Sequence, residues 1–234
     1  MPVKATLIFW SLAISCSLVL GNFALAYAAP CYGTGMPQKN KISLGLESYA
    51  IFKRYLENDY GKLRSAQYFL DLSYGVFDWL AIDLKGGFGN IRQHPIGSDE
   101  IDYPTRLGGG YGFRLKFYDR KDAKMVFGFQ HISIHPYAVS IGAMKHKAVL
   151  DDWQFSILAS YNLKKVTPYL GTRWSRLDYI HWQDGERSRI KSASGKNIGL
   201  IVGADIALPK NLWINLEGSF FDSEALAFSL KYNF

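Results

Sequence analysis

A histidine and a serine two positions apart, His131 and Ser133, have the spacing of a catalytic base and its nucleophile. Residues i and i+2 lie on one face of a β-strand, so His131 could take the proton of the Ser133 hydroxyl. Such a pair also needs a carboxylate that orients the histidine, and the chain from Ile134 to Lys147 contains no Asp or Glu. We therefore favour the alternative, in which the two side chains have no catalytic role.

Two other groupings of histidines could do chemistry. His181 follows Asp178, as in an acid–histidine pair, but it comes three positions later rather than two. His131, His135 and His146 could hold a metal ion, although no cysteine or carboxylate shares their spacing. We predict no catalytic residue, no metal site and no cofactor.

Charged residues also fall at regular positions on the polar side of alternating segments. If that side lines the inside of a narrow barrel, the charges should pair, because an unpaired charge away from water costs several kcal/mol. The alternative is a polar path for small solutes. The acids and bases balance, and we predict a lumen charge network of Glu47, Asp71, Asp83, Lys85, Arg114, Lys116, Arg173, Asp205, Glu217 and Lys231.

The segments that would position these charges are about ten strand-like runs in which apolar and polar residues alternate. The runs span roughly 41–54, 66–77, 79–89, 105–118, 124–139, 153–161, 166–179, 197–206, 212–220 and 225–234. Short turns alternate with longer polar stretches, among them 57–64, 92–104 and 180–195. In the fifth run the apolar parity switches, which predicts a β-bulge near Gln130–His131.

The first residues have the pattern of a secretory signal peptide. Lys4 precedes an apolar core, and Ala26-Tyr27-Ala28 fits the small-x-small cleavage rule. We predict a cleaved signal at 1–28, a periplasmic lead-in at 29–40 and one barrel domain at 41–234. An uncleaved membrane helix is the alternative. Cleavage of the signal would remove Cys16 and leave Cys31 alone, so no intramolecular disulfide is predicted and the role of Cys31 stays open.

The chain of 234 residues carries a formal net charge of +7. Basic proteins often bind nucleic acid, but this sequence contains no basic helix and no zinc-ligand or RNA-binding motif, so we predict no nucleic-acid partner. Cations in the longer loops could instead meet lipid phosphates, although an ordinary solvated loop is equally compatible. These loop cations are Lys62, Arg64, Lys145, Lys147, Arg187, Arg189, Lys191 and Lys196.

The end of the chain carries the most specific pattern. Leu226, Phe228, Leu230, Tyr232 and Phe234 share one face of a strand. A terminal aromatic with hydrophobic residues at every second position before it resembles the C-terminal signal of bacterial outer-membrane β-barrel proteins. The whole mature chain resembles the OmpA-like and omptin-like small barrels, by pattern rather than by motif. This resemblance implies the cell envelope of a Gram-negative bacterium, with recognition of the last strand by the barrel-assembly machinery.

Two enzyme families share parts of these patterns. His131-x-Ser133 resembles part of the His-x-Ser-Asn motif of outer-membrane lipid A deacylases, but Ile134 stands where that motif has Asn. Omptin proteases have an Asp-x-His dyad, whereas Asp178 and His181 have one more residue between them. Both departures argue against an enzyme.

We expect an all-β, up-and-down antiparallel transmembrane barrel of about ten strands, with eight or twelve as alternatives. A soluble lipocalin-type barrel is the rival fold. Both termini should be periplasmic, and aromatic girdles should mark the two membrane interfaces. The predicted girdle residues are Trp79, Trp153, Trp174, Trp213, Tyr232 and Phe234.

The predicted function is that of a non-enzymatic outer-membrane barrel with a largely salt-bridged, closed lumen and a structural or surface-interaction role. A narrow porin-like channel for small hydrophilic solutes is the alternative, and a lipid A-modifying enzyme is a more distant one. The expected partners are outer-membrane lipid and lipopolysaccharide. The pattern does not indicate a solute or an oligomeric state.

Overall fold

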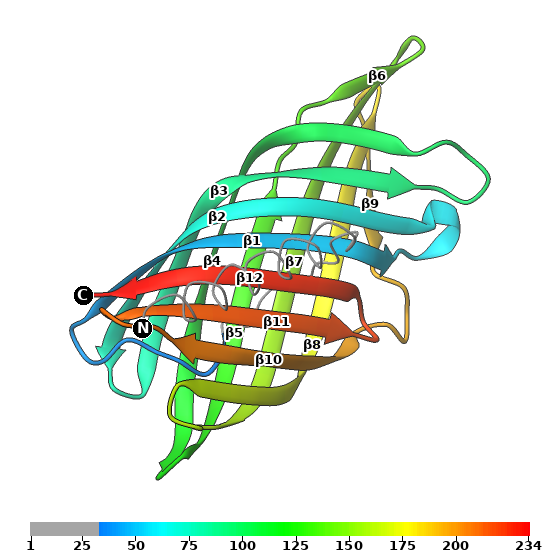
Figure 1. Cartoon of the computed structure of the whole chain (residues 1–234). Coiled ribbons are helices and arrows are strands. Elements are labelled where there is room, and N and C mark those ends of the chain that lie inside the picture. Colours follow the sequence, from blue (N-terminus) through cyan, green and yellow to red (C-terminus); the bar gives the residue numbers. More distant parts are fainter. Residues whose placement is uncertain (1–32) are drawn as a thin grey trace, which may run out of the picture.

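A computed structural model describes residues 33–234 of the chain (Figure 1). The predicted signal peptide and Cys31 lie outside the described residues. Within 33–234, no helix has the length and apolar character needed to cross a membrane.

The chain forms a closed antiparallel barrel of ten strands, which confirms the predicted fold and strand number. The ring closes because the first strand pairs with the last, with Leu46 opposite Leu230. Three short elements, η1 (Asn58–Tyr60), β6 (Val139–Ile141) and β9 (Glu186–Lys191), are added to it. The ten barrel strands are β1 (Ile42–Tyr55), β2 (Lys62–Phe77), β3 (Leu80–His94), β4 (Ile101–Arg120), β5 (Ala123–Ile134), β7 (Met144–Tyr161), β8 (Val166–Gln183), β10 (Ile198–Ala207), β11 (Leu212–Phe220) and β12 (Glu224–Asn233).

The two ends of the barrel differ. The connections at 78–79, 121–122, 162–165 and 208–211 are tight, and we call their side of the barrel the short-turn end. The opposite side carries η1, β6 and β9, and we call it the long-loop end (Figure 1).

Alternation along each strand separates an apolar outward face from an inward face. On β12 the inward Lys231 is 2% exposed, whereas the outward Tyr232 is 38% exposed. Leu46, Leu70 and Leu84 are likewise among the exposed apolar side chains. A soluble barrel would turn its apolar side chains inward, so this distribution is that of a barrel whose wall faces lipid.

The predicted bulge at Gln130–His131 is wrong. Pairing between β5 and β7 continues through this region without a shift, with Gln130 opposite Gln154 and His131 opposite Trp153. Ile132 and Ile134 therefore lie on the inward face, where they are 2% and 0% exposed. The apolar parity switches because the inside of the barrel changes from polar to apolar along the strand.

The stretches predicted as polar loops are largely strand. β2 begins at Lys62, β3 runs to His94, β4 begins at Ile101 and β8 runs to Gln183. Backbone pairing therefore continues past the apolar band at the long-loop end, and side chains that are polar in sequence lie on ordered strands.

At the long-loop end, β9 connects to β1 above the ends of the shorter strands β10, β11 and β12. The Glu57 N–H donates to the Lys191 carbonyl and the Ala193 N–H donates to the Tyr55 carbonyl, both at 2.9 Å. Leu56 and Ser192 form a β-bridge between them. The segment 191–196 therefore joins the end of β9 to the end of β1. We call it the β9–β1 bridge.

An apolar cluster fills the inside of the long-loop half. Two of its tyrosines, Tyr103 and Tyr179, satisfy their buried hydroxyls by sharing a hydrogen bond of 3.0 Å. The members of this apolar plug are Tyr49, Ile51, Leu56, Leu63, Phe69, Ile91, Tyr103, Ile132, Ile134, Ala148, Leu150, Leu177, Tyr179, Ile190 and Ala225.

The inward position of Ile134 predicts a stability difference. Ile134→Ala should lower the free energy of unfolding by about 2–5 kcal/mol, because the apolar plug cannot fully refill the space. Ile157→Ala is the matched control, since Ile157 points outward and is 45% exposed, and it should cost clearly less. Urea unfolding of the refolded barrel, followed by tryptophan fluorescence, measures both; equal losses would contradict the inward assignment of Ile134.

Candidate functional site

Ion pairs fill the inside of the short-turn half. Their side chains are at most 2% exposed, so each charge depends on its partner rather than on water. The partners come from different strands that are adjacent or next but one in the sheet, and the pairs therefore tie neighbouring strands together on the inward face. The three pairs are Lys85 Nζ with Glu47 Oε1 at 2.5 Å, Arg114 Nη2 with Asp83 Oδ1 at 2.9 Å, and Lys231 with Asp71.

A second group of charges lies where the polar layer meets the apolar plug. The Asp222 carboxylate accepts hydrogen bonds from Arg54 Nη1 at 2.9 Å, Arg173 Nε at 2.7 Å and Ser175 Oγ at 2.6 Å. The sequence indicated only Arg173. Arg54 follows a register shift after Ile51, which moves it to the inward face, and Asp222 lies in the turn between β11 and β12.

Two of the predicted acids bind neutral donors. The Tyr169 hydroxyl donates to Glu217 Oε2 at 2.8 Å, and Asn215 Nδ2 donates to Asp205 Oδ1 at 2.7 Å. Neutral hydrogen-bond donors can satisfy a buried carboxylate as a cation would, although more weakly.

Lys116 is the one predicted lumen charge that the structure places elsewhere. A register shift between Lys116 and Tyr118 ends the regular alternation of β4. Lys116 Nζ then contacts Asp119 Oδ2 at 2.5 Å at the short-turn rim, with 19% of its side chain exposed. It takes no part in the buried network.

The predicted lead-in does not lie wholly outside the barrel, because Thr34 is 2% exposed within its short-turn mouth. The Thr34 and Gly35 N–H groups both donate to Asp205 Oδ2 at 3.2 Å, and the Gly35 carbonyl accepts from Arg114 Nη1 at 2.5 Å. A Cβ on Gly35 would lie 1.9 Å from the Trp213 ring, so only glycine fits there. Residues 33–37 thus form an N-terminal plug at this mouth.

The contact between Gly35 and Trp213 also shows that one predicted girdle residue, Trp213, is not part of a lipid-facing girdle. Trp213 pairs with Lys231 on the inward face, so its ring covers the N-terminal plug rather than facing lipid. Trp79 and Trp174 are outward and are 49% and 41% exposed. Trp153 is outward on β7, with its ring stacked on His131 at a centroid distance of 3.9 Å. Outward positions at the end of the chain are held by Tyr232 and Phe234, which are 38% and 60% exposed.

Ser133 has a carboxylate neighbour that the sequence did not reveal. Strand register places Asp151 opposite Ser133, and Ser133 Oγ lies 2.5 Å from Asp151 Oδ1 and 2.9 Å from His135 Nε2. The serine therefore lies between the carboxylate and His135, and its hydroxyl is directed to Asp151. A nucleophile needs the reverse order, with a histidine between serine and acid, and His131 is held against Trp153.

The structure does not bring His146 together with His131. His146 Nδ1 lies 3.1 Å from His181 Nε2 at the long-loop end, far in register from His131. Among residues 33–234, no group of three or more potential ligands is placed to hold a metal ion.

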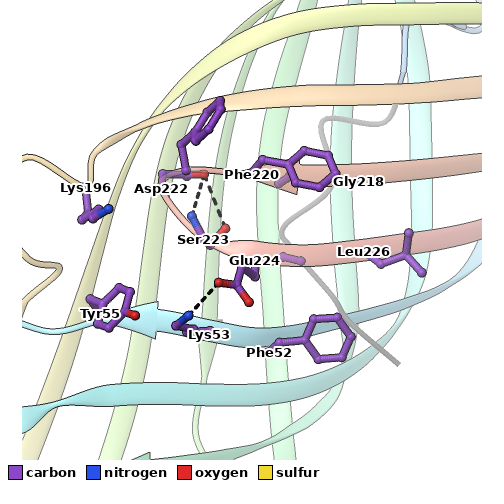
Figure 2. Close-up of a pocket in the computed structure, with 13 residues that line it drawn as sticks. Phe52, Lys53, Tyr55, Lys196, Gly218, Phe220, Asp222, Ser223, Glu224 and Leu226 are labelled. Carbon is purple, nitrogen blue, oxygen red and sulfur yellow. Dashed lines mark hydrogen bonds and ion pairs between the residues drawn. The ribbon is translucent and has the colours of Figure 1, made fainter. Parts of the chain in front are cut away.

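A surface pocket of about 700 Å³ lies on the outer wall beside the β9–β1 bridge (Figure 2). Lys53 and Lys196 line it, and both ammonium groups lie near the Tyr55 ring, at 5.1 and 6.0 Å from its centroid. Lys53 Nζ also contacts Glu224 Oε1 at 2.7 Å. Phe220 contributes to the apolar part of the lining.

A closed antiparallel barrel with an apolar outer wall and a polar layer inside defines a transmembrane β-barrel. No protein-family model matches the chain, and no curated protein sequence matches it.

Solved outer-membrane barrels are similar in fold. The translocator domain of the autotransporter NalP from Neisseria meningitidis is 10% identical, with 98% of this chain and 96% of that chain covered and a TM-score of 0.44. An outer-membrane channel from Pseudomonas putida F1 is 11% identical, with 88% and 98% covered and a TM-score of 0.42. The outer-membrane protease OmpT from Escherichia coli is 12% identical, with 88% and 100% covered and a TM-score of 0.38.

Because Asp222 is buried, we predict that removing its charge strongly lowers the free energy of unfolding. Asp222→Asn should lower the free energy of unfolding by about 3–5 kcal/mol, because Arg54 and Arg173 would keep buried charges without their carboxylate. Asp119→Asn removes the same charge from a side chain that is 41% exposed and should cost less than about 1 kcal/mol. Urea unfolding of both variants tests this, and similar costs would mean that Asp222 is not the partner of the two arginines.

Proposed function

We propose that this protein is a closed barrel of the outer membrane that does not conduct solutes and acts through its outer surface, in a structural or surface-interaction role. The short-turn end and both termini face the periplasm in this proposal, and the long-loop end faces outward. Short turns on the periplasmic side and elaborated connections on the outer side are the usual arrangement in such barrels.

The apolar plug is the observation that carries the proposal. A hydrated ion could enter the polar layer at the short-turn end, but it would then meet Ile132, Ile134, Leu63 and Ile91, which are at most 2% exposed. Moving an unpaired ion into such surroundings costs several kcal/mol or more. A barrel of ten strands is also close in size to the eight-stranded barrels that side chains fill.

Two further features support a closed state. The N-terminal plug is bound to Asp205 and Arg114 at the short-turn mouth. The β9–β1 bridge crosses from β9 to β1 at the other mouth through its hydrogen bonds to Tyr55 and Glu57. Outer-membrane lipid is the partner of the wall, and the barrel-assembly machinery is the proposed partner of β12 during insertion.

A narrow channel remains the second candidate, because the ion-paired layer would give it charged walls. A channel would require the apolar plug to move aside. Electrical conductance across a bilayer therefore separates the closed barrel from the channel.

Planar-bilayer recordings of the refolded barrel should show no discrete conductance, although the protein is inserted and heat-modifiable on gels. A chain that begins at Lys39 lacks the N-terminal plug and should also be silent, because the apolar plug still closes the other half. Reproducible conductance steps from the intact barrel would contradict the proposal and support the channel. Steps from the shortened chain alone would make the N-terminal plug the closing element.

A further inference from the structure

We infer that the pocket beside the β9–β1 bridge binds a phosphorylated glycolipid of the outer leaflet, with its acyl chain on the outer wall and a phosphate between Lys53 and Lys196. The inference rests on the proposed orientation of the barrel, but it does not depend on the closed lumen.

The pocket is produced by a difference in strand length. β11 ends at Phe220 and β12 begins at Glu224, whereas β1 runs on to Tyr55 and meets the β9–β1 bridge above them. Gly218, paired with Leu226, leaves the wall without a side chain at this point. The pocket therefore extends from apolar residues of β11 and β12 to the β9–β1 bridge, and Figure 2 shows Gly218 and Leu226 on one side of it and Lys196 on the other.

The apolar part of the pocket faces the membrane. Phe220 and Phe221 are 48% and 73% exposed, and Phe221 has a φ of 77°, a conformation that bulky residues rarely adopt. Glu224 lies eight residues along β12 from Tyr232, which places it roughly 19 Å across the membrane at ~3.3 Å per residue and ~45° of tilt. The apolar band of such barrels is about 25 Å tall, so the pocket spans the height of acyl chain and headgroup.

The charged part of the pocket suits a phosphate. Lys53 and Lys196 both line this cavity, and both ammonium groups lie near the Tyr55 ring. In this inference their side chains turn toward a phosphate held between them. Glu224 is the opposing charge, and in the structure it pairs with Lys53. Its side chain is 58% exposed, so it can turn away when an anion takes its place. Asp222 also lines the pocket, but its carboxylate is buried and bound by two arginines.

A second pocket beside the first favours a glycolipid over a phospholipid as the ligand. It has a volume of about 690 Å³ and adjoins the first, because Tyr55 and Lys196 line both. Asn58, Lys62 and His94 add polar groups to it, at the rim of the long-loop end. A phospholipid headgroup would fill only the first pocket, whereas a phosphorylated sugar headgroup would extend past Lys196 into the second.

The test is a titration of the refolded barrel in detergent with phosphorylated lipid A, with bound lipid counted by native mass spectrometry. Both ends of the barrel are accessible in detergent, so a failure here is separate from a wrong orientation or from a conducting lumen. Lys53→Gln with Lys196→Gln should weaken binding roughly tenfold. Glu224→Gln should tighten it about twofold to fivefold, because it removes the carboxylate that competes with phosphate.

The matched control removes two cations from another part of the same end. Lys147 and Arg187 lie beside the Trp182 ring, at 4.8 and 5.7 Å from its centroid. Lys147→Gln with Arg187→Gln should change binding less than about twofold if the pocket, and not the overall charge, holds the lipid.

A shape variant tests the acyl part. A Cβ on Gly218 would meet the Phe220 ring at 3.4 Å, an ordinary contact, so Gly218→Leu should fill the groove and weaken binding while the barrel still folds. Gly86→Leu is its control, since a Cβ there has no neighbour within 4 Å and Gly86 does not line the pocket.

Three results would overturn the inference. Equal weakening by the two double variants would mean diffuse attraction to the basic rim. Equally tight binding of dephosphorylated lipid A would exclude recognition of phosphate. Equally tight binding of phosphatidylglycerol, with the same dependence on Lys53 and Lys196, would make the occupant a phospholipid.

Discussion

The carboxylate of Asp222 joins parts of the barrel that would otherwise be separate. It lies in the turn between β11 and β12, and it binds Arg54 from β1 and Arg173 from β8. These strands extend beyond β10, β11 and β12, so the carboxylate holds the short hairpin against the two long walls beside it. Because a buried charge requires its partners, this one group holds together the region in which the polar layer meets the apolar plug.

The interior is polar in the short-turn half and apolar in the long-loop half, and the two halves are filled in different ways. Strands that cross lipid need apolar residues outside, and the ten-stranded ring leaves room inside for long charged side chains such as Arg114 and Lys231. At the β9–β1 bridge, Leu56 and Ile190 are buried members of the apolar plug. Closing the barrel with apolar side chains at this end requires no further ion pairs, whose desolvation would offset most of their attraction.

Period-two alternation was sufficient to predict the barrel, its strands and most of the inward charges, because a lipid-facing wall constrains every second residue. It did not predict contacts that depend on register between strands, such as Asp151 opposite Ser133. It also failed where alternation is interrupted, as at Arg54 after the shift in β1. The bulge predicted from Ile132 and Ile134 is wrong for another reason. Alternation shows which residues share a face of the strand, but it does not show that the inward face is polar.

The N-terminal plug and the outer pocket could not be predicted from the alternation pattern, and a glycine contributes to each. At Gly35 the absence of a side chain allows the backbone to lie against the Trp213 ring, and at Gly218 it leaves a depression in the wall. Because side chains fill the interior of this barrel, a ligand is more easily bound on its outer surface, where two lysines line a pocket. Here the cavity lies beside Lys53 and Lys196, where β11 and β12 end at the Asp222 turn while β1 continues to Tyr55.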